Sequence, residues 1–236
     1  VGQRVYGSPK LLEKKEMWVR VTSLGASRQV GRSCILLQTP ESNIMLDCGI
    51  DVSAYDSDMF PYLSAPEFKI DQLDAVIISH AHTDHIGLLP YLYKMGYRCP
   101  CYMTAPTGDI GALLMLDMIS ISHKQAKKEL YTTKDIKETV KHAIVLDYDE
   151  VTDITPDMRL TFYNAGHILG SSLVHLNIGN GMHNFCYTGD FNYEQSNLLS
   201  PAHTQFPRLE TVMMESTYGG KEDTPITRKE GELSVM

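Results

Sequence analysis

The feature that most constrains this chain is the segment Ser79-His80-Ala81-His82-Thr83-Asp84-His85, which combines three histidines with one aspartate. The apolar run at residues 75–79 is typical of a buried strand, and residues 86–95 have the pattern of a helix. Three imidazoles and a carboxylate cannot all be buried without partners, because unpaired polar groups are costly in a protein interior. Imidazole and carboxylate together are ligands that suit zinc, so the sequence predicts a metal site at this strand-to-helix junction.

The spacing within this segment divides the four candidate ligands into two pairs. His80 and His82 alternate along an extended stretch, so their rings point to the same side. Asp84 and His85 lie on the first turn of the next helix and diverge from that pair. Two metal ions roughly 3.5–4 Å apart form the clamp that is used in phosphoester hydrolysis. The competing interpretation is a surface histidine cluster with incidental metal affinity, and four ligand groups at this junction favour the metal site.

Four further polar residues each follow a predicted strand. They are Asp47, His167, Asp190 and Glu215. Catalytic groups are commonly placed on loops at the ends of rigid strands. Taken singly each position is a weak signal, because an aspartate before Cys-Gly is usually a turn and a histidine between glycines can be an ordinary loop residue.

Strand and helix patterns alternate along the chain. Apolar runs bounded by turn residues predict strands at 18–22, 34–38, 43–46, 75–79, 143–146, 159–164, 173–178, 184–187 and 211–214. Helical spacing is found at 86–95, 106–128 and 133–141. Strands at both ends with helices between them predict a mixed α/β layered fold.

Composition limits the class of protein. The 236 residues include 43% hydrophobic and 21% charged residues, which excludes a disordered chain. No segment approaches the roughly 18 apolar residues of a membrane helix, and no secretory leader is apparent, so we expect no membrane partner. The net charge of -8 argues against a general nucleic-acid coat protein, but not against an enzyme that meets a phosphate backbone at a metal centre. Five cysteines without a framework pattern predict a cytoplasmic setting.

Residues 123–142 are rich in lysine and carry two histidines. Such a stretch can contact an RNA backbone. Glu129, Asp135 and Glu138 dilute the positive charge, which favours a solvated helix face instead.

The ordered set of Asp47, the H-A-H-T-D-H motif, His167 and Asp190 resembles the metallo-β-lactamase superfamily. The segment Glu215-Ser216-Thr217-Tyr218 makes the chain similar to the β-CASP nucleases within it. The motifs G-L-L-P-Y-L-Y-K, N-A-G-H-I-L-G-S-S and Y-T-G-D-F-N-Y-E are similar to archaeal homologues of the cleavage and polyadenylation specificity factor endonuclease. This resemblance implies an α/β fold, a metallo-β-lactamase-type αββα sandwich that is incomplete, with only the start of the β-CASP insertion.

The resemblance also implies a division of the chain into three parts. Residues 1–16 are expected to be a linker or tail, residues 17–220 the N-terminal part of a metallo-β-lactamase domain, and residues 221–236 the start of a truncated β-CASP domain. The family has two more histidines beyond Glu215, one for the second zinc site and one as general acid. No histidine follows Glu215 in this sequence. We therefore expect an N-terminal fragment with little or no nuclease activity of its own.

The resemblance further implies two Zn²⁺ ions held by six side chains. The ligands of the first ion would be His80, His82 and His167. The ligands of the second would be Asp84 and His85, and Asp190 would bridge both ions. Three carboxylates would take part in catalysis: Asp47, Asp84 and Glu215. In this assignment Asp47 orients the metal-bound water or a ligand, and Glu215 supports the histidine that acts as general acid.

The implied function is that of a zinc-dependent RNA endonuclease of the 3′-end-processing or transcription-termination type, which hydrolyses phosphodiesters with a metal-bridging hydroxide. The expected partners are an RNA substrate and a second copy of the chain or subunits of a processing complex. Three alternatives stay open. They are a 5′-to-3′ exonuclease, a small-molecule hydrolase of the same fold such as a thioesterase or lactonase, and a non-catalytic fragment that acts as a binding module.

Overall fold

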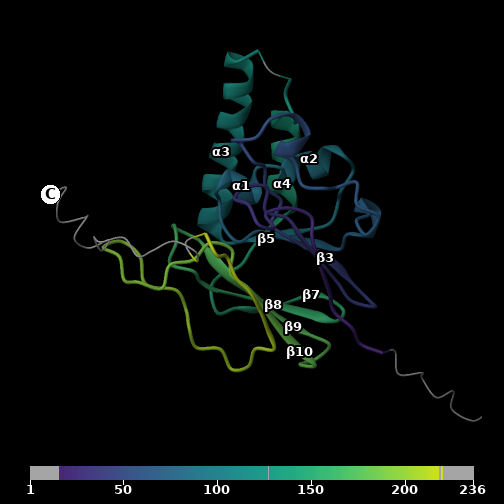
Figure 1. Cartoon of the computed structure of the whole chain (residues 1–236), viewed down its shortest axis with the longest axis vertical. Coiled ribbons are helices and arrows are strands. Elements are labelled where there is room, and N and C mark those ends of the chain that lie inside the picture. Colours follow the sequence, from purple (N-terminus) through teal and green to yellow (C-terminus); the bar gives the residue numbers. More distant parts are fainter. Residues whose placement is uncertain (1–15, 127, 218, 220–236) are drawn as a thin grey trace, which may run out of the picture.

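Two β-sheets form the centre of the computed structural model, which describes residues 16–126, 128–217 and 219 (Figure 1). The first sheet has the order β1-β2-β3-β4-β5-β6. Its strands are β1 (Arg20–Ser23), β2 (Ile35–Gln38), β3 (Asn43–Leu46), β4 (Ala75–Ile77), β5 (Cys101–Met103) and β6 (Ala143–Val145). Strands β1 to β3 pair antiparallel, and β3 to β6 pair parallel. The carboxyl ends of β3 and β4 therefore lie at the same edge of the sheet.

The second sheet has the order β11-β10-β9-β8-β7. Its strands are β7 (Val151–Thr155), β8 (Met158–Asn164), β9 (Ser172–Ile178), β10 (His183–Tyr187) and β11 (Thr211–Met213). The first four pair antiparallel, and β11 pairs parallel with β10. The turn between β9 and β10 contains Gly179, Asn180 and Gly181, all with positive φ, which is typical of a tight hairpin turn.

In the described part of the chain, four helices lie on the side of the first sheet that faces away from the second (Figure 1). They are α1 (Thr83–Ile86), α2 (Leu89–Lys94), α3 (Ala105–Lys124) and α4 (Thr133–His142). Short 3-10 turns at Asp56–Met59 and Ile70–Gln72 lie in the connection between β3 and β4. Among the described residues the order of layers is thus helix, sheet, sheet. This confirms the predicted α/β class and the incomplete sandwich.

The predicted helix at 86–95 is divided into α1 and α2. The backbone N–H of Leu88 donates to Cys48 O, 2.9 Å away, instead of continuing the helix. Gly87 also lies so close to Ile50 that an added Cβ would meet Ile50 Cγ2 at 2.7 Å. The chain bends here because α1 packs against the loop after β3, which a local helical pattern does not reveal.

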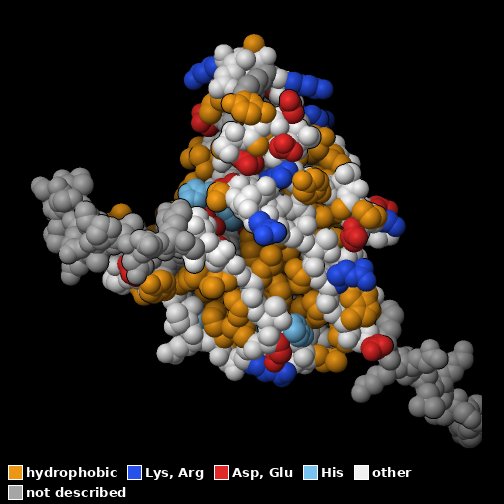
Figure 2. All heavy atoms as spheres, in the orientation of Figure 1, with side chains coloured by type: hydrophobic (Ala, Val, Ile, Leu, Met, Phe, Trp, Pro, Cys, Tyr) orange, Lys and Arg blue, Asp and Glu red, His pale blue; other side chains and the backbone are white. Residues whose placement is uncertain are grey.

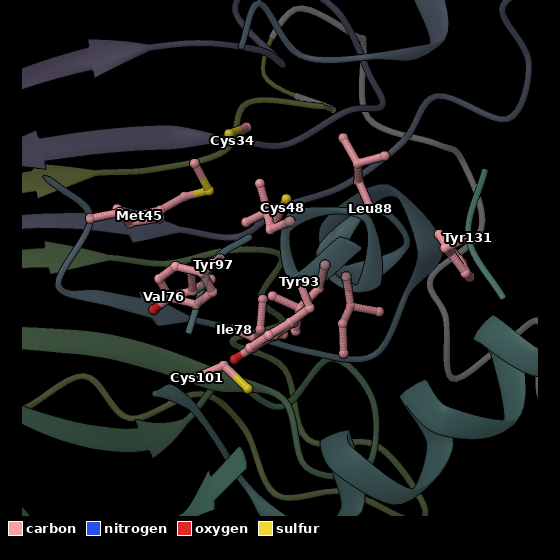
Figure 3. Close-up of a cluster of buried hydrophobic side chains, with 14 of the residues drawn as sticks. Cys34, Met45, Cys48, Val76, Ile78, Leu88, Tyr93, Tyr97, Cys101 and Tyr131 are labelled. Atoms are coloured by element: carbon pink, nitrogen blue, oxygen red, sulfur yellow. The ribbon is translucent and has the colours of Figure 1, made fainter. Parts of the chain in front are cut away.

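The hydrophobic core has two main parts, one on each face of the first sheet. Between the sheet and the helices, Met45, Val76 and Ile78 pack against Tyr93 and Tyr97 (Figure 3). Between the two sheets, buried side chains from both interdigitate, including Leu37, Ile77, Phe162, Leu176 and Phe185. Each fully buried side chain of this size contributes about 1.5–3 kcal/mol. The strand ends that carry the candidate ligands are therefore held by a core on both sides.

The surface shows where the lysine-rich segment lies. Blue side chains gather at the tip formed by the end of α3, whereas orange side chains cover the middle of the same face (Figure 2). The lysines Lys124, Lys128, Lys134, Lys137 and Lys141 are exposed, which agrees with a solvated helix face. No helix in the described part of the chain has the length and apolar content that a bilayer crossing requires. The proposed linker at 1–15 and the proposed β-CASP start at 221–236 lie outside the described residues.

Candidate metal centre

The predicted ligands come from the ends of strands in both sheets. His80 follows β4, and His82, Asp84 and His85 stand at the start of α1 or just before it. His167 follows β8 and Asp190 follows β10, both in the second sheet. The carboxyl ends of these strands meet at one edge of the sandwich, so residues far apart in the sequence are brought together.

Four of these side chains form a compact group. His82 Nδ1 lies 3.0 Å from His80 Nε2 and 3.2 Å from His167 Nε2. Asp190 Oδ2 lies 3.8 Å from His80 Nε2 and 3.6 Å from His167 Nε2. All four donor atoms lie within 4.8 Å of one another. Four ligand atoms arranged tetrahedrally around zinc at about 2.0–2.1 Å lie about 3.3 Å apart, so the spacing and the donor types fit one zinc ion.

A second group lies on the other side of Asp190. His85 Nε2 lies 3.3 Å from Asp190 Oδ1 and 3.7 Å from Asp84 Oδ2. The two oxygens of Asp190 thus face different histidines, with Oδ2 toward His80 and His167 and Oδ1 toward His85. A carboxylate placed in this way can be shared between two metal ions.

Asp47 is completely buried and accepts four hydrogen bonds. Oδ1 accepts from the backbone N–H of Ser79 at 2.7 Å. Oδ2 accepts from Ser79 Oγ at 2.8 Å, from Tyr187 Oη at 2.8 Å and from His85 Nδ1 at 2.7 Å. The bond to His85 places the proton on Nδ1, which leaves Nε2 directed at the second group. Asp47 therefore contacts a candidate ligand and positions its ring.

The titratable groups of the site influence one another. Burial, together with the neighbouring histidines, holds the pKa of His80 well below its usual value. Burial also lowers the pKa of His167, although Asp190 opposes this. For His85, burial favours the neutral ring, but the carboxylates of Asp47 and Asp190 overcome this and raise its pKa to about 10. The pKa of Asp190 is lowered because His85 outweighs the effect of burial. In the metal-free protein, His85 is thus a charged partner of two carboxylates.

A cavity of about 590 Å³ opens beside the second group. Asp84, His85 and Asp190 line one part of it, and Glu215 lines another. Glu215 accepts hydrogen bonds from Phe191 N at 3.2 Å and from Thr217 Oγ1 at 2.6 Å, so it lies near the ligands without joining the compact group of four.

Three neighbours of the candidate ligands were not predicted from the sequence. Ser79 and Tyr187 bind Asp47, and Ser33 Oγ lies 3.4 Å from His85 Nε2. Ser79 is part of the histidine segment, and Tyr187 stands three residues before Asp190. Their nearness in sequence to a predicted ligand could have indicated a place in the site. Ser33 carried no such signal.

Comparison with known proteins agrees with this fold. A family model described as the metallo-beta-lactamase superfamily domain matches residues 36–217, and the chain belongs to this superfamily. The predicted resemblance is thereby confirmed. Among its relatives, the transcription termination factor FttA of Methanothermobacter thermautotrophicus is 54% identical over 237 residues, a match that covers 100% of this chain and 37% of that protein. Transcription termination factor FttA of Pyrococcus abyssi is 51% identical over 243 residues, with the same coverage of 100% and 37%.

One solved structure supports the fold independently of sequence. A protein of unknown function from Enterococcus faecalis superposes with a TM-score of 0.54 at 18% identity, over 75% of this chain and 44% of that chain. This likeness concerns the fold alone. The chain spans 37% of the length of the FttA relatives it matches, so it corresponds to one part of those proteins.

Proposed function

We propose that this chain is the metal-binding part of a zinc-dependent ribonuclease that cuts RNA at 3′ ends during processing or transcription termination. The observation that carries the proposal is the position of Asp190, whose two oxygens face two separate groups of candidate ligands. Similarity over the whole chain to proteins named transcription termination factors supports the choice of RNA as substrate.

The proposed cofactor is a pair of Zn²⁺ ions. His80, His82 and His167 would hold the first, Asp84 and His85 the second, and Asp190 both. Zinc in such a site lowers the pKa of bound water to about 7 and polarises a phosphoryl oxygen. The β-CASP character proposed for the chain rests on the Glu215-Ser216-Thr217-Tyr218 segment.

The protein's own contribution in this proposal is to fix the ligands and to place charge. Asp47 keeps the proton of His85 on Nδ1, so that Nε2 is the free donor atom. The core on both sides of the first sheet keeps the strand ends in place, which reduces the reorganisation required when substrate binds. Glu215 lines the cavity, and in this proposal it would orient a proton donor for the leaving oxygen.

Two alternative functions are distinguished from this proposal by assays of cleavage and binding. A hydrolase of small molecules would use the same ligands, and cleavage of thioesters or lactones without any effect on RNA would favour it. A binding module without turnover would take up zinc or bind RNA and cleave neither kind of substrate. A cytoplasmic location is also part of the proposal, and it rests on the five cysteines, all of which are free thiols.

Zinc content and RNA binding test the proposed function directly. The purified chain, refilled with zinc, is expected to bind two ions and a fluorescent single-stranded RNA, with weak or no turnover. His82→Ala should lose one ion, whereas His123→Ala, which changes an exposed histidine on α3, should lose none. The proposal would be refuted if the wild-type chain did not take up stoichiometric zinc.

A further inference from the structure

We propose that the loop of residues 25–32 holds the RNA backbone beside the metal centre, and that Arg28 binds the phosphate next to the one being cleaved. This inference rests on the proposed ribonuclease function and adds the residue that would hold the substrate strand. No predicted site residue lies in this loop, which joins β1 to β2.

The first support is the cavity beside the metal centre. Residues 25–31 line one wall, and the candidate ligands Asp84, His85 and Asp190 line another. Of the described residues around this cavity, Arg28 is the one lysine or arginine, whereas Asp84, Asp190 and Glu215 all carry carboxylates. The cavity is thus lined by the acidic candidate ligands and by a single arginine among the described residues.

Charge explains why a cation is needed in this cavity. A polynucleotide carries one negative charge per phosphate, and metal ions at the centre neutralise only the phosphate that they contact. The neighbouring phosphate would otherwise meet the carboxylate of Glu215 and the remaining acidic surface. A guanidinium binds phosphate through two parallel N–H donors, which fixes position as well as charge. Arg28 makes no ion pair with any other described residue, so its guanidinium is available.

The backbone of the loop changes the sign of φ several times. Ala26, Arg28, Gly31 and Arg32 all have positive φ, interspersed with residues that do not. Alternation of this kind gathers successive backbone N–H groups on a concave side, as in the nests that bind phosphate. Ser27 and Arg28 form a hydrogen-bonded turn within this loop.

The loop is fixed to the metal centre at its far end. Arg32 Nη1 donates to Phe60 O at 3.0 Å, and Arg32 Nη2 donates to Gln29 Oε1 at 3.2 Å. The guanidinium of Arg32 also lies 5.0 Å from the ring centre of Tyr62. The next residue, Ser33, donates its N–H to Asp84 O at 2.8 Å. Arg32 therefore holds the loop in shape, while Arg28 is left exposed at the cavity.

The lysine-rich end of α3 does not serve this purpose. Thr104, at the start of α3, bonds to Gly170 O near His167. A helix of 20 residues extends about 30 Å from that point, so Lys124 and its neighbours lie far from the centre. Arg28 is the cation placed to act on a phosphate adjacent to the cleaved one.

The test is the salt dependence of RNA binding by the zinc-loaded 236-residue chain. Fluorescence anisotropy with a labelled single-stranded RNA is measured between roughly 50 and 300 mM potassium chloride. The measurements give the slope of log Kd against the logarithm of the salt concentration. Arg28→Ala should reduce the slope by about 0.7, the value for one phosphate contact on a single strand. Arg28→Lys should keep the slope and bind severalfold more weakly than wild type, because the two-donor geometry is lost.

Arg159→Ala is the matched control, because it removes an exposed arginine that pairs with Asp153 on the second sheet. It should leave slope and affinity unchanged. If the wild-type chain binds RNA and Arg28→Ala has the same slope, the role of Arg28 is refuted and the proposed function is not. A loss of zinc from Arg28→Ala would also overturn this role of Arg28, by showing a structural role. Absence of RNA binding by the wild-type chain would overturn the proposed function together with this inference.

Discussion

Replacement of Asp47 by asparagine is the sharpest test of how this centre is held together. Asp47 Oδ2 accepts three hydrogen bonds and Oδ1 accepts one. Asparagine tolerates the positive φ of 58° at this position, so the backbone need not change. The substitution therefore removes the charge and turns one acceptor atom into a donor, with little change of shape.

The cost of this change follows from the four contacts. With the amide oxygen in place of Oδ2, the amide nitrogen faces the N–H of Ser79 and leaves it unsatisfied, at about 1–3 kcal/mol. The other three hydrogen bonds lose a charged acceptor, which weakens each by about 1 kcal/mol. The metal-free chain should thus lose about 4–6 kcal/mol, a large part of a typical 5–15 kcal/mol stability. Zinc affinity at the second group should fall about 10–100-fold, as for other partners of metal-binding histidines.

The pH dependence gives a signature that simple destabilisation does not. The pKa of His85 is raised to about 10, so its contribution to stability is fully present below pH 6.5 and is lost as the pH rises toward 10. Without the charge of Asp47, the pKa of His85 should fall toward 6.5, and this loss should shrink. Urea unfolding of the metal-free chain at pH 6 and pH 8, with Asp153→Asn as the exposed control, measures the difference. Equal pH slopes in wild type and Asp47→Asn would refute the role given to Asp47.

Two further predictions concern zinc and glycine. Zinc affinity at the second group should rise about tenfold per pH unit between about pH 7 and 9, because binding displaces a proton from His85, whereas the affinity of the first group should change little. Competition with a chromogenic chelator measures both affinities. A zinc affinity of the second group that does not change with pH would contradict the assignment. Gly49→Ala should destabilise the chain by more than about 2 kcal/mol, because the new Cβ would meet Asp84 O at 1.6 Å. Gly108→Ala on α3, where Met103 Sδ lies 3.4 Å away, should stabilise it by about 0.5–1 kcal/mol, as thermal unfolding of both variants will show.

The local parts of the centre could be predicted from the sequence, and its long-range contacts could not. The alternation of His80 and His82 after a buried strand correctly placed both donor atoms on one side, 3.0 Å apart. The bond between Asp47 and Tyr187 joins residues separated by 140 positions. No periodic pattern records which strand ends of two packed sheets will face each other, so this contact required the structure.

The dependence on long-range contacts also explains which strands and loop conformations could not be predicted from the sequence. Strand β7 was not predicted, since Val151–Thr155 is a partly exposed edge strand with an aspartate in its middle. Strand β5 has only three residues between Pro100 and the start of α3, too few to show alternation. The positive φ values of Ala26 and Arg28 also had no signal, because these residue types rarely adopt that region. Short or edge elements and strained loops are defined by their neighbours more than by their own residues.

The centre links metal binding to the packing of the two sheets. His80, His82, Asp84 and His85 belong to the first sheet and its following helix, whereas His167 and Asp190 belong to the second sheet. Asp47, after β3, also bonds to Tyr187 at the end of β10, so the sheets are joined by a buried polar contact even without metal. A metal ion that binds ligands from both sheets adds a second connection at the same edge, and its binding free energy then contributes to holding the sandwich together. In this proposal the candidate ligands would therefore secure the fold and, in the same geometry, place the donor atoms where the proposed chemistry needs them.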